Sequence, residues 1–209
     1  MAFDPASLRL CLVTDRGLAG GRSLIDVVLA AVKGGATMAQ LREKEATTRA
    51  FVDQARALMA ALAPLGVPLM INDRLDVALA VDADGLHVGQ TDMPVVEARR
   101  LLGPDKIVGL SIEAAEQVLR PDAEAADYLG VGPVYAQQTK ADAAPPLGLD
   151  GLRRVRASTG KPIVAIGGLT PDNSAPALAA GADGLAVVSA LMAAADPEAV
   201  ARRFVGLFG

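Results

Sequence analysis

Eight short apolar segments recur along the 209-residue chain, and longer stretches whose apolar residues repeat at helical spacing lie between them. Most of the short segments are nearly continuous apolar runs, which is typical of parallel strands covered on both faces. The pattern predicts strand–helix units in series. The predicted strands span 8–15, 38–43, 68–73, 85–89, 106–111, 128–133, 162–169 and 184–189.

Eight such units without a break in composition favour one α/β domain over residues 1–209, a single-domain (β/α)₈ TIM barrel. An open doubly wound sheet is the alternative. That fold normally carries a GxGxxG turn after its first strand. Here the first strand runs into "TDRGLAGGRS", whose glycines have a different spacing, so the barrel is favoured.

Charge and composition exclude several classes of protein. The net charge is −4 and both signs are mixed along the chain, so no broad basic face for nucleic acid is expected. The first residues lack the regions of a secretory signal, and no apolar run is long enough to span a membrane. We therefore expect a cytoplasmic protein with small-molecule ligands. The subunit number is left open, with a homo-oligomer as one alternative.

Polar residues and glycines follow the predicted strands where those strands end. In a barrel the carboxyl ends of the strands form the rim that carries the active site. Any one of these residues could be a solvated loop residue or a helix cap, but the whole set predicts a site at the rim. Its members are Asp15, Gln40, Arg42, Lys44, Asn72, Asp73, Gln90, Asp92, Ser111, Glu113, Thr139, Lys140, Gly167, Gly168, Val188 and Ser189.

Asp73 and Asp92 follow the third and fourth strands, which are neighbours about 5 Å apart in a barrel. Two carboxylates without histidine or cysteine ligands favour a hard cation. Mg²⁺ usually takes one or two protein carboxylates and completes its coordination with water and phosphate oxygens. The alternative is that the two aspartates cap the helices beginning near Arg74 and Pro94.

The segment "QLREK" places Gln40, Arg42 and Lys44 on one side of the second strand by alternation. Cations beside a carboxylate-bound Mg²⁺ suit a diphosphate ligand. A salt-bridge network between these cations and the neighbouring acids is the alternative.

A second anion site is predicted in the opposite part of the rim. Loops after strands seven and eight of such barrels often bind phosphate through backbone N–H groups. Gly167 and Gly168 allow close backbone approach, and Ser189 offers a hydroxyl and an N–H group. A tight turn followed by a helix cap is the alternative.

The long segment 134–148 after the sixth strand is interpreted as an active-site lid, from which Lys140 could reach inward. Three other residue types invite structural interpretations. His87, the only histidine, is expected to be a hydrogen-bonded residue of the barrel interior rather than a catalytic base. Cys11 is expected to be a buried, inert thiol, and Met59, Met70 and Met192 are assigned to packing.

Taken together, these motifs resemble the thiamine phosphate synthase family over nearly the whole chain, from about residue 13 to 190. The fold and the "GG" and "VVS" phosphate motifs also occur in a related branch, the thiazole tautomerases. The acids, "QLREK" and Lys140 separate the two branches. The matching segments are "QLREK", "INDRLDVALAVDADGLHVGQTD", "GLS", "YLGVGPVYAQQTK", "APPLGL", "AIGGL" and "GADGLAVVSA".

The resemblance implies a transferase of thiamine biosynthesis that depends on Mg²⁺. Its expected reaction joins hydroxymethylpyrimidine diphosphate to hydroxyethylthiazole phosphate, or to the carboxylated form of the thiazole, and releases diphosphate. By the same resemblance Asp73 and Asp92 bind the metal. The pyrimidine diphosphate is assigned to Gln40, Arg42, Lys44, Asn72, Ser111 and Lys140, and the thiazole phosphate to Thr139, Gly168, Val188 and Ser189.

One position departs from the family pattern. The family usually has two threonines around one residue before the lysine, whereas Gln137 replaces the first threonine here, giving "QQTK". Glutamine still donates a hydrogen bond, so we interpret Gln137 as a changed contact to the thiazole phosphate rather than a lost one.

A departing diphosphate needs stabilisation more than the attacking nitrogen needs a base, so we hypothesise a dissociative substitution. The residues expected to act on the reacting groups are Arg42, Lys44, Lys140 and Ser111. Two other functions remain open: an isomerase acting on the thiazole phosphate without metal, and a non-catalytic sensor of phosphorylated ligands.

Overall fold

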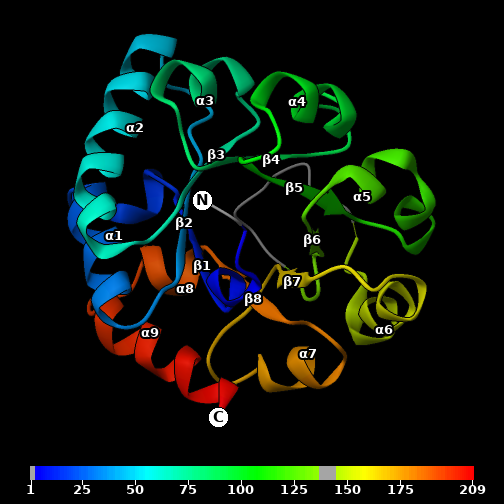
Figure 1. Ribbon diagram of the computed structural model, residues 1–209. Helices are drawn as coiled ribbons and strands as arrows, with labels where there is room; N and C mark the ends of the chain where they lie inside the picture. Colours follow the sequence, from blue (N-terminus) through cyan, green and yellow to red (C-terminus); the bar gives the residue numbers. More distant parts are fainter. Residues whose placement is uncertain (1–2, 137–144) are drawn as a thin grey trace.

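The computed structural model describes residues 3–136 and 145–209 and shows a closed barrel of parallel strands in chain order (Figure 1). Each strand pairs with the next, and pairing of β1 with β8 closes the ring. The single-domain TIM barrel is thereby confirmed, and the open sheet is excluded. The strands are β1 (Leu10–Val13), β2 (Met38–Leu41), β3 (Leu69–Asn72), β4 (Gly85–Val88), β5 (Ile107–Ile112), β6 (Tyr128–Val131), β7 (Ile163–Ile166) and β8 (Gly184–Val187).

Helices surround the barrel and cover the outer faces of its strands (Figure 1). Some of them begin with a side-chain cap: Ser23 accepts a hydrogen bond from Asp26 N, and Thr47 accepts one from Ala50 N. The helices are α1 (Leu24–Lys33), α2 (Thr48–Leu62), α3 (Leu75–Val81), α4 (Val95–Leu102), α5 (Pro121–Ala125), α6 (Gly148–Ser158), α7 (Ala175–Ala179), α8 (Ser189–Met192) and α9 (Pro197–Val205). Short 3₁₀ helices are η1 (Pro5–Leu8), η2 (Gly17–Ala19), η3 (Ala63–Leu65), η4 (Ala115–Leu119) and η5 (Gly206–Phe208).

The strands separate two hydrophobic cores. The larger core lies between the strands and the helices, and it takes the outward side chains of every strand, such as Leu12 and Ile71. The smaller core lies inside the barrel and contains Cys11, Met38 and Met70. Both faces of each strand are therefore buried, which explains why the strands are nearly continuous apolar runs rather than alternating ones.

The amino-terminal end of the barrel is closed by η1. Leu8 of this helix is fully buried and belongs to the inner core. Its carbonyl oxygen packs so closely on β8 that a Cβ at Gly184 would lie 1.9 Å from it. Only glycine fits at that position, and the barrel interior opens at the carboxyl ends of the strands.

The expected packing residues behave as predicted. Cys11 is buried, and its burial raises the pKa of the thiol to about 12, so the thiolate does not form near neutral pH. Met70 and Met192 are fully buried, and Met59 packs against the outer core. Within the part of the chain that the structure describes, no helix is both long and apolar enough to cross a bilayer.

Candidate active site

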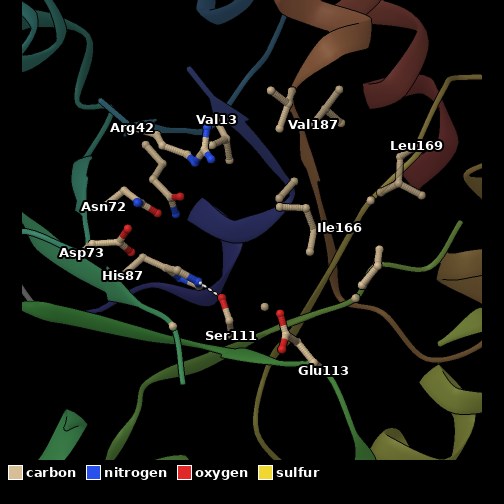
Figure 2. Close-up of a pocket in the computed structure, with 18 of the residues that line it drawn as sticks. Val13, Arg42, Asn72, Asp73, His87, Ser111, Glu113, Ile166, Leu169 and Val187 are labelled. Atoms are coloured by element: carbon tan, nitrogen blue, oxygen red, sulfur yellow. Dashed lines mark hydrogen bonds between the residues drawn. The ribbon is translucent and has the colours of Figure 1, made fainter. Parts of the chain in front are cut away.

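A cavity of about 370 Å³ lies at the carboxyl ends of the strands, where the sequence predicts the active site. Figure 2 shows charged and polar side chains such as Arg42 and Asp73 on one side of it, and the apolar Ile166 and Val187 on the other. Of the predicted rim, it is lined by Gln40, Arg42, Lys44, Asn72, Asp73, Gln90, Asp92, Ser111, Glu113, Gly167, Gly168, Val188 and Ser189.

Asp73 follows β3 in a tight turn that directs its side chain into this cavity. Its backbone φ is 63°, in the left-handed region, which aspartate tolerates better than most residues. Arg74 N donates to Asn72 O at 2.7 Å and closes a three-residue turn around Asp73. Asp73 N donates to His87 O at 2.8 Å, so the turn stays attached to β4.

The carboxyl groups of Asp73 and Asp92 lie close enough together to share a hydrogen bond when one of them is protonated. Burial, the charge of Asp92 and that hydrogen bond together raise the pKa of Asp73 to about 6 from an ordinary value of 3.8. The nearby charges of Lys44 and Arg42 act in the opposite direction. The two acids predicted to share a cation therefore do face one small volume.

The alternative assignment of these aspartates as helix caps is wrong for the described chain. The N-cap residues of α3 and α4 are Arg74 and Pro94, and neither helix has a side-chain cap. Asp92 instead accepts a hydrogen bond from Gly89 N at 2.7 Å, which holds its carboxylate at the rim.

Arg42 and Lys44 lie just beyond the end of β2 and line the cavity, while Glu43 between them pairs with Arg16 at 2.9 Å. The predicted alternation is thus correct. The fully buried Thr14 accepts a hydrogen bond from Arg42 N at 3.0 Å and fixes the backbone there. The salt-bridge alternative holds only in part, because the Arg42 guanidinium lies 3.8 Å from the Asp15 carboxylate. Asp15 itself does not line the cavity.

The opposite side of the cavity contains Gly167 and Gly168, which the sequence places in the seventh strand. The strand ends at Ile166, and both glycines have positive φ, 102° and 65°. Added Cβ atoms would lie 2.5 Å from Pro133 Cβ and 2.6 Å from Ala136 O. The tight-turn alternative therefore accounts for both glycines. A phosphate contact at Gly168, Val188 and Ser189 stays a prediction, with Ser189 at the first position of α8.

Hydrogen bonds link His87 to two other residues at the base of the cavity. His87 Nδ1 lies 2.9 Å from Tyr128 Oη. His87 Nε2 lies 2.9 Å from Ser111 Oγ, and Figure 2 shows this second bond as a dashed line. Burial lowers the pKa of His87 to about 4, so its ring is neutral near neutral pH. The expectation of a hydrogen-bonded interior histidine is confirmed.

Tyr128 is the contributor to this site that the sequence reasoning missed. Strand alternation contained the signal, because Tyr128 shares its face of β6 with Gly130, and Gly109 shares its face of β5 with Ser111. A Cβ at Gly109 would lie 2.3 Å from Tyr128 Cζ and 2.5 Å from His87 Nδ1. The glycine leaves room for the two rings.

Three predicted site residues, Gln137, Thr139 and Lys140, lie outside the described residues, as does the central part of the predicted lid 134–148. Their assignments therefore stay predictions.

Comparisons with known proteins decide the family. A family model described as thiamine monophosphate synthase matches residues 10–191. The chain belongs to this family. A thiamine-phosphate synthase of Albidiferax ferrireducens is 58% identical over 94% of this chain and 90% of its own. One of Chloroflexus aurantiacus is 54% identical over 95% of this chain and 92% of its own.

The fold of this chain also matches a solved structure of a related protein. Thiamine phosphate pyrophosphorylase from Pyrococcus furiosus superposes with a TM-score of 0.87 and is 36% identical, covering 97% of this chain and 96% of that one. The resemblance based on the motifs is confirmed, as is the enzyme class, a transferase of thiamine biosynthesis. The roles of individual residues are not tested by these comparisons.

Proposed function

We propose that this chain joins hydroxymethylpyrimidine diphosphate to hydroxyethylthiazole phosphate, or to its carboxylated form, in a reaction that requires Mg²⁺. The products are thiamine phosphate and diphosphate, together with CO₂ when the carboxylated form reacts. The observation that carries the proposal is the charged side of the cavity, where two adjacent carboxyl groups and two cations surround one volume. An isomerase acting on a thiazole phosphate alone does not need this cluster of two carboxyl groups and two cations.

The acids suit a Mg²⁺ ion shared with a substrate. Asp73 and Asp92 repel one another when both are ionised, and a cation between them removes that repulsion. Among the described residues no group of three or more His, Cys, Asp or Glu side chains could hold a metal. Two carboxylates are nevertheless sufficient for Mg²⁺ when diphosphate oxygens and water complete its coordination.

Arg42 and Lys44 lie close enough to Asp73 for their charges to offset part of the rise in its pKa, and we assign both to the diphosphate. An Arg guanidinium can hold two phosphate oxygens at once, whereas a Lys ammonium acts as a point charge. Gln40, Asn72 and Ser111 line the same cavity and are assigned to the pyrimidine diphosphate. Lys140 is assigned to it by the family pattern.

On the opposite side, the thiazole phosphate is assigned to Gly168, Val188 and Ser189, with Thr139 and Gln137 assigned by the family pattern. The apolar Ile166 and Val187 lie on that same side (Figure 2). Two phosphorylated molecules held on opposite sides bring their rings together over the middle of the barrel.

The reaction then needs no protein base, because the attacking thiazole nitrogen already has a lone pair. The bond from the pyrimidine methylene carbon to diphosphate oxygen breaks, and diphosphate leaves with the electron pair. The thiazole nitrogen donates its lone pair to that carbon and forms the new C–N bond. Bound Mg²⁺ supplies charge that stabilises the departing diphosphate. We assign the same role to Arg42, Lys44 and Lys140, and we assign to Ser111 the orientation of the substrate.

The deciding experiment is an assay with both substrates that follows release of diphosphate with Mg²⁺ and with EDTA. We expect turnover only with both substrates and the metal. Conversion of the thiazole phosphate alone, insensitive to EDTA, would indicate the isomerase instead. Binding of thiamine phosphate without any product from the two precursors would indicate the sensor.

The metal assignment is tested separately by Asp92→Asn, which keeps the side-chain shape and removes the charge. We expect turnover at limiting Mg²⁺ to fall on the order of 10²-fold or more, with partial recovery at high Mg²⁺. Full activity of Asp92→Asn at limiting Mg²⁺ would disprove the metal assignment while leaving the reaction itself intact.

A further inference from the structure

The hydrogen bonds at the base of the cavity form a chain that has a direction. It runs from Tyr128 through His87 to Ser111, and of these three residues only Ser111 also belongs to the predicted substrate contacts. Tyr128 is buried and does not line the cavity, whereas His87 is also buried but does line it. Each hydroxyl has one proton and a neutral imidazole has one N–H group, so fixing one link fixes the next.

We propose that His87 is a positioning residue whose proton is held on Nε2, so that Ser111 accepts from His87 and directs its own hydroxyl proton at an acceptor on the pyrimidine diphosphate. The inference rests on the proposed function and adds a direction to one of its contacts. His87 makes no bond to the reacting atoms in this arrangement and acts through Ser111.

The direction follows from the far end of the chain. Burial raises the pKa of Tyr128 well above 10, so its hydroxyl keeps its proton. Among the described residues the hydrogen-bond partner of this buried hydroxyl is His87 Nδ1, 2.9 Å away, and a buried hydroxyl proton left without an acceptor costs free energy. The phenol proton therefore points to His87 Nδ1. His87 Nδ1 is then the acceptor, and the ring proton lies on Nε2.

The surroundings of Ser111 agree with this direction. Its backbone carbonyl accepts from Gln90 Nε2 at 2.6 Å, which fixes the end of β5. Its side chain lines the cavity together with Arg42 and Lys44, both suited to an anion. With the reverse direction the serine proton would point at the histidine and present an oxygen lone pair to a negatively charged ligand, which is repulsive.

The positions of the two rings are enforced by glycine on both neighbouring strands. A Cβ at Gly109 would lie 2.5 Å from His87 Nδ1, and a Cβ at Gly130 would lie 2.9 Å from His87 Cε1. His87 and Tyr128 are tilted by 37° with ring centroids 5.5 Å apart, an arrangement that keeps both edges in hydrogen-bonding reach.

The direct test is ¹⁵N NMR of the imidazole in the ligand-free protein. His87 is the only histidine, so its two ring nitrogens are identified without further assignment. We expect a protonated Nε2 and an unprotonated Nδ1. In Tyr128→Phe the donor to Nδ1 is gone, and we expect the proton to move toward Nδ1. Tyr135→Phe is the matched control, because it removes the other tyrosine hydroxyl, which donates to Asn173 O, and should leave the His87 spectrum unchanged.

A kinetic cycle tests the consequence for the substrate. Tyr128→Phe should lower kcat/KM for the pyrimidine diphosphate roughly 10-fold, because Ser111 then turns toward His87 and loses its donated bond. In a Ser111→Ala background the same change should have almost no effect. A purely structural role for Tyr128 predicts equal losses in both backgrounds.

A protonated Nδ1 in the unmodified protein would overturn the inference, and so would equal kinetic losses in the two backgrounds. These results are distinguishable from failure of the proposed function. If the protein forms no thiamine phosphate from the two substrates, the proposed function fails whatever the NMR spectrum shows. If it turns over with the proton on Nδ1, only the directed chain fails.

Discussion

Asp73 combines a strained backbone with an unfavourable charge, and both features serve the cavity rather than the fold. Its φ is 63°, and its carboxyl group lies against that of Asp92. A group whose pKa rises on folding contributes its full stability below the unfolded value, here 3.8, and loses it as the pH rises through about 6. The metal-free protein is therefore destabilised by Asp73 at neutral and alkaline pH.

We expect Asp73→Asn to stabilise the metal-free protein while abolishing Mg²⁺-dependent turnover. Asparagine also tolerates the left-handed backbone, so only the charge is removed. The gain should be about 1 kcal/mol at about pH 8, because water screens part of the repulsion, and should shrink at about pH 5. Urea denaturation in EDTA at both pH values measures it. A loss of stability at the higher pH would contradict the charge argument.

The rings of Tyr128 and His87 leave no room for a side chain at Gly109. We expect Gly109→Ala to cost about 2 kcal/mol or more, because its Cβ would lie 2.3 Å from Tyr128 Cζ. Gly160→Ala is the matched control, since an added Cβ there meets nothing within 4 Å, and we expect a change within about 0.5 kcal/mol. Denaturation midpoints of the two variants give the comparison, and similar midpoints would refute the clash.

At this scale the sequence predicts which residues reach the rim but not how they bond to one another. Strand ends and alternation were sufficient to place Arg42, Asp73 and Asp92 around the cavity. The bonds of His87 to Tyr128 and Ser111 join residues up to 41 positions apart. They depend on the stagger between strands and on the space left by two glycines, which no local pattern encodes.

A repeated brace ties pairs of strands together at the amino-terminal side of the barrel. Asp84, Asp127 and Asp183 stand immediately before β4, β6 and β8. The side chain of each accepts a hydrogen bond from a backbone N–H of the preceding strand, at Leu69, Val108 and Ile163 respectively. Before β2 the hydroxyl of Thr37 accepts from Leu10 N in the same way. The barrel thus repeats in units of two strands.

We expect Asp127→Ala to cost about 1–3 kcal/mol, because it leaves the buried Val108 N–H without its acceptor and removes the carboxylate that pairs with Arg99 Nη2. The matched control is Asp172→Ala, which removes an exposed carboxylate paired only at the surface with Arg203 and should change stability by less than about 1 kcal/mol. Chemical denaturation measures both. Equal effects would show that the brace contributes no more than a surface ion pair.

The strands themselves were predictable as elements, since all eight lie within their predicted ranges or extend past them by one residue, as Ile112 does at the end of β5. Their ends were less so. The seventh was predicted to reach residue 169 but ends at Ile166, because Gly167 and Gly168 turn away to admit Pro133 and Ala136. A contact from a distant loop sets that boundary, and an apolar run alone does not show it.

At the scale of the molecule, the charged and apolar sides of one cavity define what the barrel should bind. We expect Mg²⁺ and inorganic diphosphate together to stabilise the protein by about 2.7 kcal/mol when the complex is present at about 100 times its Kd. Thermal unfolding should then shift upward by several degrees, and by much less with either component alone. The shift should be smaller in Asp92→Asn. An equal shift from diphosphate without metal would contradict a shared site.

Closure of the barrel by η1 affects how substrates enter the cavity and how products leave it. In the described part of the structure Leu8 closes the interior at one end, so the opening at the carboxyl ends of the strands serves as both entrance and exit. Arriving reactants and departing products must pass the same point, and a finished molecule obstructs the next pair until it has left. Because substrates and products share this opening, we expect accumulated product to inhibit the protein competitively against both substrates.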